Sequence, residues 1–253
     1  MSIEFVFIGL LVGWLVGMTG VGGAALLTPL LIFMGIPPTM AIGTDFAYNS
    51  ITKMVGTIQH MRQKTVHFQL VKHLAIGSVP SAVAANILFY LFLSDYYNEE
   101  FVMVLLGCIL MIVSLITFIQ MTFGRHSVNV WKGKPLEEKR HLTIMGGIVI
   151  GAIVGITSVG SGSLFALFML YVYNMKSSEL VGTDIAHAFL LTSISGLLMA
   201  GFGHIDYALV GNLLCGSIPG AIIGSKLTTK VPSNYIRVFI VLIIFISGMK
   251  LVF

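Results

Sequence analysis

The chain alternates between long apolar runs and short polar stretches from one end to the other. Ten apolar segments can be marked, five on each side of a polar connector at 124–141. At about 1.5 Å per helical residue, the longer segments reach across a hydrocarbon core of about 30 Å. The pattern predicts helices at about 4–19, 23–35, 38–59, 67–93, 99–123, 142–157, 162–174, 179–202, 205–226 and 233–252.

Two glycine-rich stretches, Gly17-Met-Thr-Gly-Val-Gly-Gly23 and Gly155-Ile-Thr-Ser-Val-Gly-Ser161, interrupt apolar runs. The arms on either side reach only about 18–23 Å, too short to cross the core alone. Backbone N–H groups freed in such a gap must be satisfied by protein or by a bound ligand. Short helices that meet at a break, present twice, indicate a transporter's binding site near the membrane midplane. Each pair is either a re-entrant hairpin or two short spans.

The composition excludes an ordinary soluble domain. Charged residues make up 9% of the 253 residues, apolar residues make up 57%, and the mean hydropathy is +0.98. A soluble surface needs far more charge. The net charge of +4 comes from basic residues in loops, which is typical of membrane topology rather than of a nucleic-acid surface. We therefore predict an all-α polytopic membrane protein, a single transporter domain over residues 1–253 that contacts the bilayer and no nucleic acid.

The two halves resemble each other at shifts of 138 and 139 residues. The matches are 9–22 with 147–160 at seven of fourteen positions, 43–47 with 182–186 at four of five, and 70–80 with 209–219 at six of eleven. Since each half holds five segments, an odd number, the second half should be inverted in the membrane. This predicts two inverted-topology repeats of about five helical segments each, at 4–123 and 142–252.

Loop charges predict the orientation. The loop at 60–66 and the connector at 124–141 are basic, and the loop at 94–100 is acidic. Their second-half equivalents reverse the pattern, because 203–206 has no Lys or Arg and 226–234 carries two lysines. Basic loops stay on the cytoplasmic side. We expect both termini outside and the connector in the cytoplasm. The first helix should insert uncleaved, because no basic region or cleavage site accompanies it.

The breaks are the first candidate for an anion site. A helix N-terminus carries about half a positive charge and free N–H donors, and so binds anions. We expect helices that start at Gly23 and Gly162 to hold a small anion, with neighbouring hydroxyls as further donors. The candidate substrate ligands at the breaks are Thr19, Gly20, Val21, Gly22, Gly23, Thr157, Ser158, Gly160, Ser161, Gly162 and Ser163. The alternative is close helix packing, which we favour for Gly9, Gly13 and Gly17.

Asp45 and Asp184 are the only acidic residues well inside apolar segments, and the repeat makes them equivalent. A charge at such depth is costly and usually functional, although helix capping is an alternative. Because a carboxylate repels an anion, a functional acid here would carry a proton rather than bind the substrate.

The neighbours of the two acids extend the candidate site. Tyr48 and His187 lie three residues further along, so the Asp184 carboxylate and the His187 imidazole share a helical face. Such a pair titrates near neutral pH, and the alternative for His187 is simple packing. We therefore expect the coupling residues to be Asp45, Tyr48, Asp184 and His187. Further candidate ligands on these helices are Thr44, Asn49, Lys53 and Thr183. Lys53 either binds the anion or snorkels to the cytoplasmic surface.

The same motifs carry a family resemblance over about residues 5–250. They are Gly13-Trp-Leu-Val-Gly17, Gly22-Gly23, Pro29, Pro37-Pro38, Ala41-Ile-Gly-Thr-Asp45, Gly151–Gly162, Gly182-Thr-Asp184 and Gly216-Ser-Ile-Pro219. In this order they resemble the TauE/SafE family of sulfite and sulfonate exporters. The resemblance implies a bacterial inner-membrane permease that exports small sulfur-containing anions such as sulfite, thiosulfate or organosulfonates. The family pattern often carries Ser after Gly-Thr, where this chain has aspartates.

The leading hypothesis is therefore a secondary transporter that works by alternating access around the two breaks, with proton coupling left open. The alternatives are an anion channel that uses the same helix ends and a permease for another small carboxylate or anion. The chain has no paired carboxylates at catalytic spacing and no activated nucleophile, so we expect no enzyme activity, no cofactor and no metal site. His60, His67 and His73 are spaced seven and six apart, which does not suit one helical face. A second copy of the chain is a further candidate partner.

Overall fold

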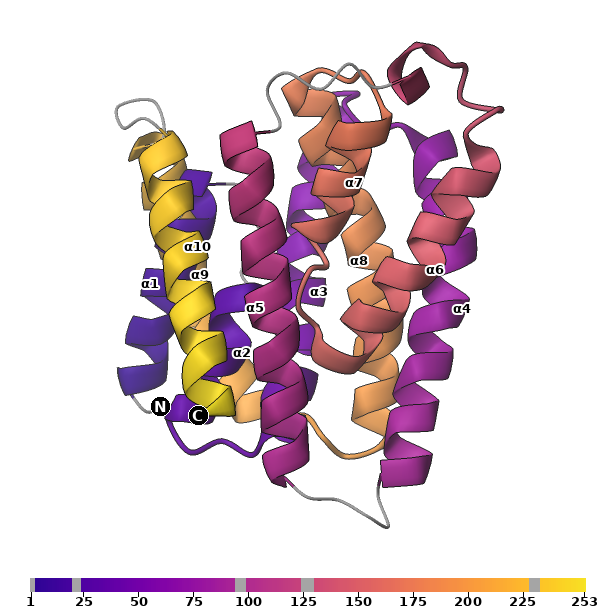
Figure 1. Ribbon diagram of the computed structural model, residues 1–253. Helices are drawn as coiled ribbons and strands as arrows, with labels where there is room; N and C mark the ends of the chain where they lie inside the picture. The colour runs from indigo at the N-terminus through magenta and orange to yellow at the C-terminus, as the bar shows by residue number, and fades with distance from the viewer. Residues whose placement is uncertain (1–2, 20–23, 94–98, 124–129, 228–232) are drawn as a thin grey trace.

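The computed structural model is an all-helical bundle (Figure 1). It describes residues 3–19, 24–93, 99–123, 130–227 and 233–253. Within these ranges the chain forms ten α-helices and one short 3-10 helix, without a strand. The elements are α1 (Ile3–Thr19), α2 (Ala24–Phe33), α3 (Pro38–Arg62), α4 (Phe68–Leu93), α5 (Glu99–Phe123), η1 (Val130–Gly133), α6 (Arg140–Thr157), α7 (Leu164–Val172), α8 (Ser177–Gly201), α9 (Tyr207–Leu227) and α10 (Ser233–Val252).

Each helix corresponds to one predicted apolar segment, which confirms the fold class. Four helices, α4, α5, α6 and α8, are long and apolar enough by length and composition to cross a membrane. Large apolar side chains are also turned outward, such as Leu197, which is 74% exposed. In a soluble protein such a surface would be unfavourable, whereas lipid tails accept it.

Glycines bring two helix pairs into close contact, α1 with α9 and α4 with α6. A Cβ on Gly13 would overlap the main-chain oxygen of Ser217, and a Cβ on Gly151 would come within 2.5 Å of the Ser78 Cα. Gly9 likewise packs against the main chain of Leu213. The packing interpretation is therefore confirmed for Gly9 and Gly13. Close approach through small residues is a common way for membrane helices to associate.

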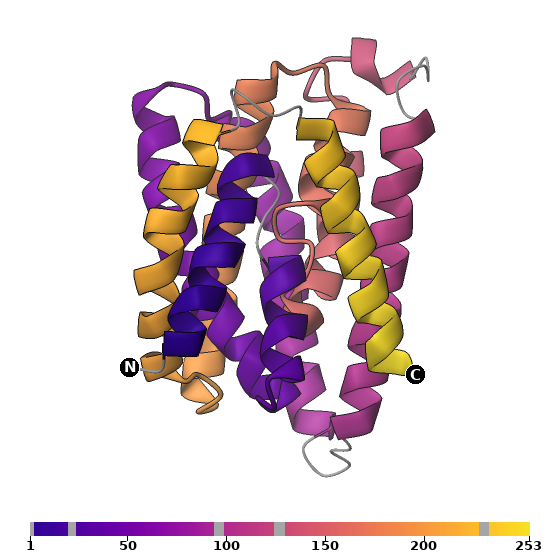
Figure 2. The same cartoon turned by 90° about the vertical axis from the view of Figure 1, so that its left-hand side faces the viewer.

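The α6–α7 pair forms a hairpin inside the bundle. In Figure 1, α6 runs inward from the end that holds η1, and α7 returns toward that same end. The residues between them, 158–163, lie in the interior and are almost entirely buried. Figures 1 and 2 show α1 and α2 as the corresponding antiparallel pair, which enters from the opposite end, where α10 finishes. The interruption in α1–α2 lies at 20–23, outside the described residues.

The long helices α3 and α8 pack against each other in the middle of the molecule. The seventh residue of each helix makes a matching contact with a loop of the opposite half. Thr44 Oγ1 accepts a hydrogen bond from the Asp206 N–H at 3.2 Å, and Thr183 Oγ1 accepts one from the His67 N–H at 3.1 Å. Both residues of the first pair are related to those of the second by the 139-residue shift. Opposite orientation of the two halves in a membrane stays a prediction.

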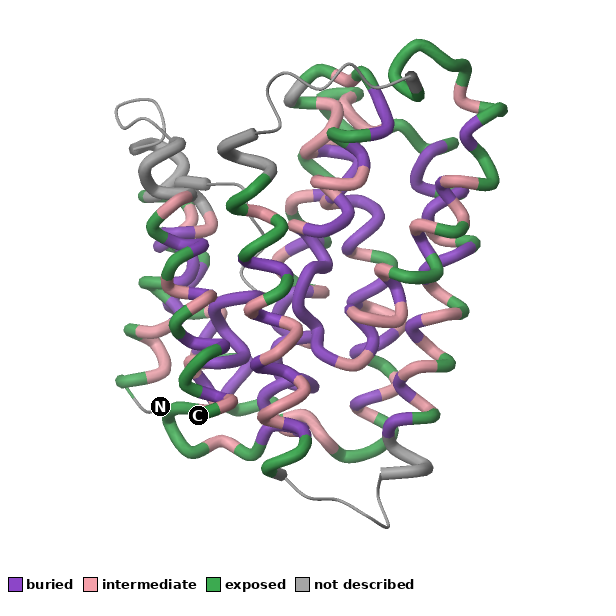
Figure 3. The backbone as a smooth tube through the Cα atoms, in the orientation of Figure 1, coloured by how far each residue is buried: buried purple, intermediate pink, exposed green. Residues whose placement is uncertain are grey.

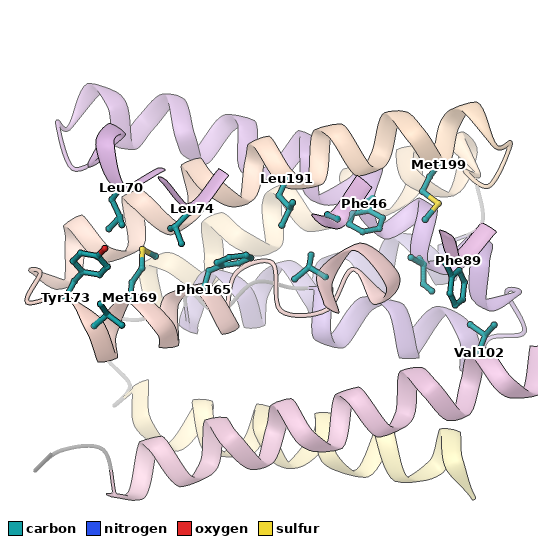
Figure 4. Packing of buried hydrophobic residues seen from close by; sticks show 14 residues of the cluster. Phe46, Leu70, Leu74, Phe89, Val102, Phe165, Met169, Tyr173, Leu191 and Met199 are labelled. Carbon is teal, nitrogen blue, oxygen red and sulfur yellow. The ribbon is translucent and has the colours of Figure 1, made fainter. Parts of the chain in front are cut away.

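The largest hydrophobic core lies where α3, α4, α7 and α8 meet. Figure 4 shows Phe46, Leu74, Phe165 and Leu191 packed side by side there. Figure 3 shows the buried stretches gathered along the inner helices and the α6–α7 connection, while α5 and α10 expose their outer faces. Polar groups that lie within this interior must find partners inside the protein, because neither water nor lipid reaches them.

Candidate functional site

Three polar side chains lie on one face of α3 at a spacing of four residues. Asp45 is 0% exposed, Asn49 is 2% exposed and Lys53 is 8% exposed. The Asn49 amide Nδ2 donates a hydrogen bond to Asp45 Oδ1 at 2.8 Å and another to the Asp45 main-chain oxygen at 2.9 Å. The helix itself therefore fixes one oxygen of the buried carboxylate.

The α6–α7 break supplies the partner of the other carboxylate oxygen. Ser158 Oγ donates to Asp45 Oδ2 at 2.6 Å. Ser158 ends α6 in the left-handed region, with φ of 61°, and its N–H donates to the Val154 oxygen at 2.7 Å. That backbone region is uncommon for a residue other than glycine. Thr28 of α2 also approaches this carboxylate, without a hydrogen bond of ordinary geometry. Asp45 is thus bonded through both oxygens.

Lys53 reaches the far side of the same break. Its Nζ donates to Ser161 Oγ at 2.8 Å and to the Ser161 main-chain oxygen at 3.2 Å. An ammonium group has three donors, so one remains beyond these two bonds. Lys53 also interacts electrostatically with Asp45 and Asp184 from beyond salt-bridge distance. Since the side chain is buried and directed inward, it does not snorkel to the membrane surface.

Asp184 and His187 face the site from α8. His187 Nε2 shares a hydrogen bond with Ser78 Oγ of α4 at 2.8 Å, and the imidazole edge meets the Phe165 ring, with 4.2 Å between ring centroids. Asp184 Oδ1 and His187 Nδ1 are buried and have no hydrogen-bond partner in the described structure. The predicted pairing of Asp184 with His187 is therefore not made as a hydrogen bond, because the imidazole is turned toward α4.

The backbone of the break holds further donors. The N–H groups of Gly160, Ser161 and Gly162 donate no hydrogen bond of ordinary geometry to any described residue. Gly160 adopts φ of 93°, a left-handed conformation that glycine tolerates without strain. Successive N–H groups beside a left-handed residue form concave anion-binding surfaces, and the N-terminus of α7 follows directly. The Lys53 ammonium, bonded to Ser161, and these main-chain N–H groups therefore belong to the same segment, 160–162.

The remaining predicted ligands lie in different places. The hydroxyls of Thr44 and Thr183 bond to loops at the two ends of the bundle, away from the break. Thr157 Oγ1 lies beside the break, where it donates to the Ile153 oxygen at 2.8 Å and accepts from the Val159 N–H at 3.2 Å. Helix α7 begins at Leu164 rather than at Gly162, and its N-cap residue, Ser163, makes no side-chain capping bond. Positions outside the described residues or side chains are Thr19, Gly20, Val21, Gly22 and Gly23.

Neither acid caps its helix, because Pro37 and Lys176 occupy the N-cap positions of α3 and α8. Tyr48 is buried on α3 and approaches Ser217 of α9, just as its repeat equivalent His187 meets Ser78. Sequence reasoning placed neither Ser78 nor Phe165 at the site. The repeat contained a signal for Ser78. At the shift of 139 residues, Tyr48 corresponds to His187 and Ser78 corresponds to Ser217, so the contact of Tyr48 with Ser217 has its equivalent in that of His187 with Ser78.

Among the described residues, no group of three His, Cys, Asp or Glu is arranged to hold a metal ion.

Comparison with known proteins agrees with this architecture. The sequence model of the family described as "Sulfite exporter TauE/SafE" matches residues 5–251. The "Probable membrane transporter protein YjnA" of Bacillus subtilis is 52% identical over the full length of both chains. A second B. subtilis protein, the "Probable membrane transporter protein YdhB", is 24% identical over 96% of this chain and 97% of its own. No solved structure matches the chain. The family match over nearly the whole sequence shows that this chain is a multi-pass membrane transporter that belongs to the TauE/SafE family.

Proposed function

We propose that this transporter moves a small sulfur-containing anion, such as sulfite, thiosulfate or an organosulfonate, through a site between Lys53 and the α6–α7 break. The observation that carries the proposal is the buried Lys53 ammonium bonded to Ser161. A cation costs free energy when it leaves water, so a buried lysine at a break in a membrane helix usually serves an ion pathway.

The donors around Ser161 suit an oxyanion. Lys53 offers one remaining N–H bond, and Gly160, Ser161 and Gly162 offer main-chain N–H groups. The first turn of α7 adds its dipole. Oxygens of a sulfite or sulfonate group accept several such bonds from different directions. The preference for sulfur anions, and export as the direction, rest on the family to which the chain belongs.

Alternating access is the mechanism that the helix arrangement favours. The α6–α7 hairpin and the α1–α2 pair enter from opposite ends, and Thr44 and Thr183 make matching contacts at those ends. Two such halves of inverted topology would open the site to each side of the membrane in turn. We place the protein in the bacterial inner membrane, with the connector in the cytoplasm and both termini outside, because the basic loop before α4 lies at the connector end, where Gln69 bonds to Glu137.

Ligand-dependent thermal stability of the purified protein tests the site. We expect sulfite, thiosulfate or a sulfonate such as sulfoacetate, sulfolactate or taurine to raise the melting temperature, and acetate to have less effect. A ligand that binds only the folded state at a hundred times its Kd stabilises by about 2.7 kcal/mol. Lys53→Met should abolish this stabilisation, because it removes the one buried ammonium from the break.

Lys72→Met is the matched control. Lys72 is exposed on α4, so its loss should leave the anion-dependent melting shift unchanged. Monodisperse elution of each variant in detergent would show that it is folded. Stabilisation of Lys53→Met equal to that of the wild type would refute the site, and wild-type protein that responds to none of the sulfur anions would refute the substrate class.

A further inference from the structure

The buried site holds one cation and two acids. Lys53 is the ammonium group of the α3 face, and it interacts electrostatically with both Asp45 and Asp184. If both carboxylates are ionised, the site carries one uncompensated negative charge before any substrate arrives. A monovalent anion that enters would add a second, and a divalent anion such as thiosulfate would add two more, in an interior that does not screen charge well. We infer that each anion binds together with one proton, and that the proton resides on Asp184. This inference rests on the proposed function.

The hydrogen bonds distinguish the two acids. Asp45 accepts bonds from Ser158 and Asn49, one to each carboxylate oxygen, and these donors stabilise its ionised form. Asp184 is 4% exposed, and its Oδ1 has no partner. A buried charge without hydrogen bonds is unfavourable, and protonation removes that charge. Of the two carboxyl groups, Asp184 therefore gains more from taking a proton.

Other titrating groups come from the helices that pack against α8. α3 contributes Lys53, Asp45 and His60, whose ring lies beside Gly182 of α8. α4 contributes the buried His73, and Tyr173, which directly follows α7, pairs with Thr143 of α6. On α8 itself, His187 bonds to Ser78 and lies edge-on to Phe165. A protonated His187 would place a second cation near Lys53, with which it interacts electrostatically. A neutral Asp184 creates no such repulsion.

The linkage between proton and anion is measurable with probes that do not themselves titrate. Thiosulfate and methanesulfonate keep their charge between about pH 6 and about pH 8, so any pH dependence of binding belongs to the protein. We expect the Kd of the wild type to rise by up to about tenfold per pH unit where Asp184 is ionised before binding. Calorimetry in two buffers of different protonation enthalpy should give uptake of one proton per anion in that range.

Asp184→Asn mimics the protonated acid, so it should bind the same anions with an affinity that no longer depends on pH. Glu179→Gln is the matched control, because Glu179 lies in the first turn of the same helix and pairs with His67 at the surface. It should keep the wild-type pH dependence. The calorimetric proton count on the wild type needs no variant, and so decides the matter even if Asp184→Asn fails to fold.

The outcomes separate this inference from the proposed function. Anion binding without proton uptake at any pH would overturn the proton inference and leave the anion site intact. A pH dependence of anion binding that persists in Asp184→Asn and disappears in His187→Gln would overturn the assignment to Asp184. Failure of both probes to bind the wild type at every pH would overturn the anion site itself, and the inference with it.

Discussion

Asp45 and Asp184 occupy equivalent places, each the eighth residue of a long helix and each buried, but their surroundings differ. Asp45 is held by Asn49 and Ser158, while Asp184 Oδ1 has no partner. Sequence explains the difference, because Ala188 stands where the first half has Asn49. The helices that carry the acids remain alike, since Thr44 and Thr183 make matching bonds to loops at opposite ends of the bundle. The two halves therefore share these scaffold contacts and differ in their polar interior.

Lys53 shows the same divergence one turn further along α3. Its equivalent on α8 is Thr192, whose hydroxyl donates to the Ala188 oxygen at 2.8 Å within its own helix. Only the α3 side therefore presents a cation to the break. The proposed site is therefore asymmetric among the described residues, because α3 supplies a cation and a carboxylate bonded through both oxygens, whereas α8 supplies a carboxylate with an unbonded oxygen.

The shared scaffold gives the prediction with the largest effect. Gly13→Leu and Gly151→Leu should each destabilise the protein by about 3 kcal/mol or more, and by similar amounts, because each forces a tightly packed helix pair apart. Unfolding in detergent, followed by circular dichroism, measures both. Gly211→Leu on α9 is the control, since a Cβ there would meet nothing within 4 Å. A large loss in one variant and none in the other would break the equivalence of the halves.

Replacement of each acid by alanine should give two unequal effects, of which the larger is comparable with that of the glycine variants. Asp45→Ala leaves the donors of Ser158 and Asn49 unpaired and removes a charge partner of Lys53, so we expect a loss of about 3–5 kcal/mol. Asp184→Ala removes a carboxylate with an unbonded oxygen, and should cost about 1–2 kcal/mol at neutral pH. The measurement is the free energy of unfolding of each variant. Equal losses would contradict the contrast drawn between the acids.

Much of this could be predicted from the apolar pattern, for a physical reason. Membrane helices must satisfy their backbone N–H and C=O groups internally, so long apolar runs in the sequence identify the helices directly. Intramembrane charges are rare, which made Asp45, Asp184 and Lys53 conspicuous. The role of Gly13 followed from its four-residue spacing with other glycines.

The contacts between halves were not readable in the same way. Lys53 and Ser161 are 108 residues apart, and Asp45 and Ser158 are 113 apart. A repeat aligns equivalent residues, whereas the site joins non-equivalent ones, so alignment of the halves could not pair them. Helical spacing placed Asp184 and His187 on one face. The hydrogen bond that His187 shares with Ser78 instead depends on the packing of α4 against α8.

The smallest predicted effect asks whether Asn49 alone separates the two acids. Asn49→Ala should cost about 1 kcal/mol, since it removes a hydrogen bond and leaves Asp45 Oδ1 as unpartnered as Asp184 Oδ1. In the Asp184→Asn background it should have a second consequence. Asp45 would then be the remaining acid with a free oxygen, and pH dependence of thiosulfate binding, absent in Asp184→Asn, should return in part. If the double variant stays independent of pH, the bond from Ser158 suffices to keep Asp45 ionised, and the contrast between the halves depends on the break rather than on Asn49.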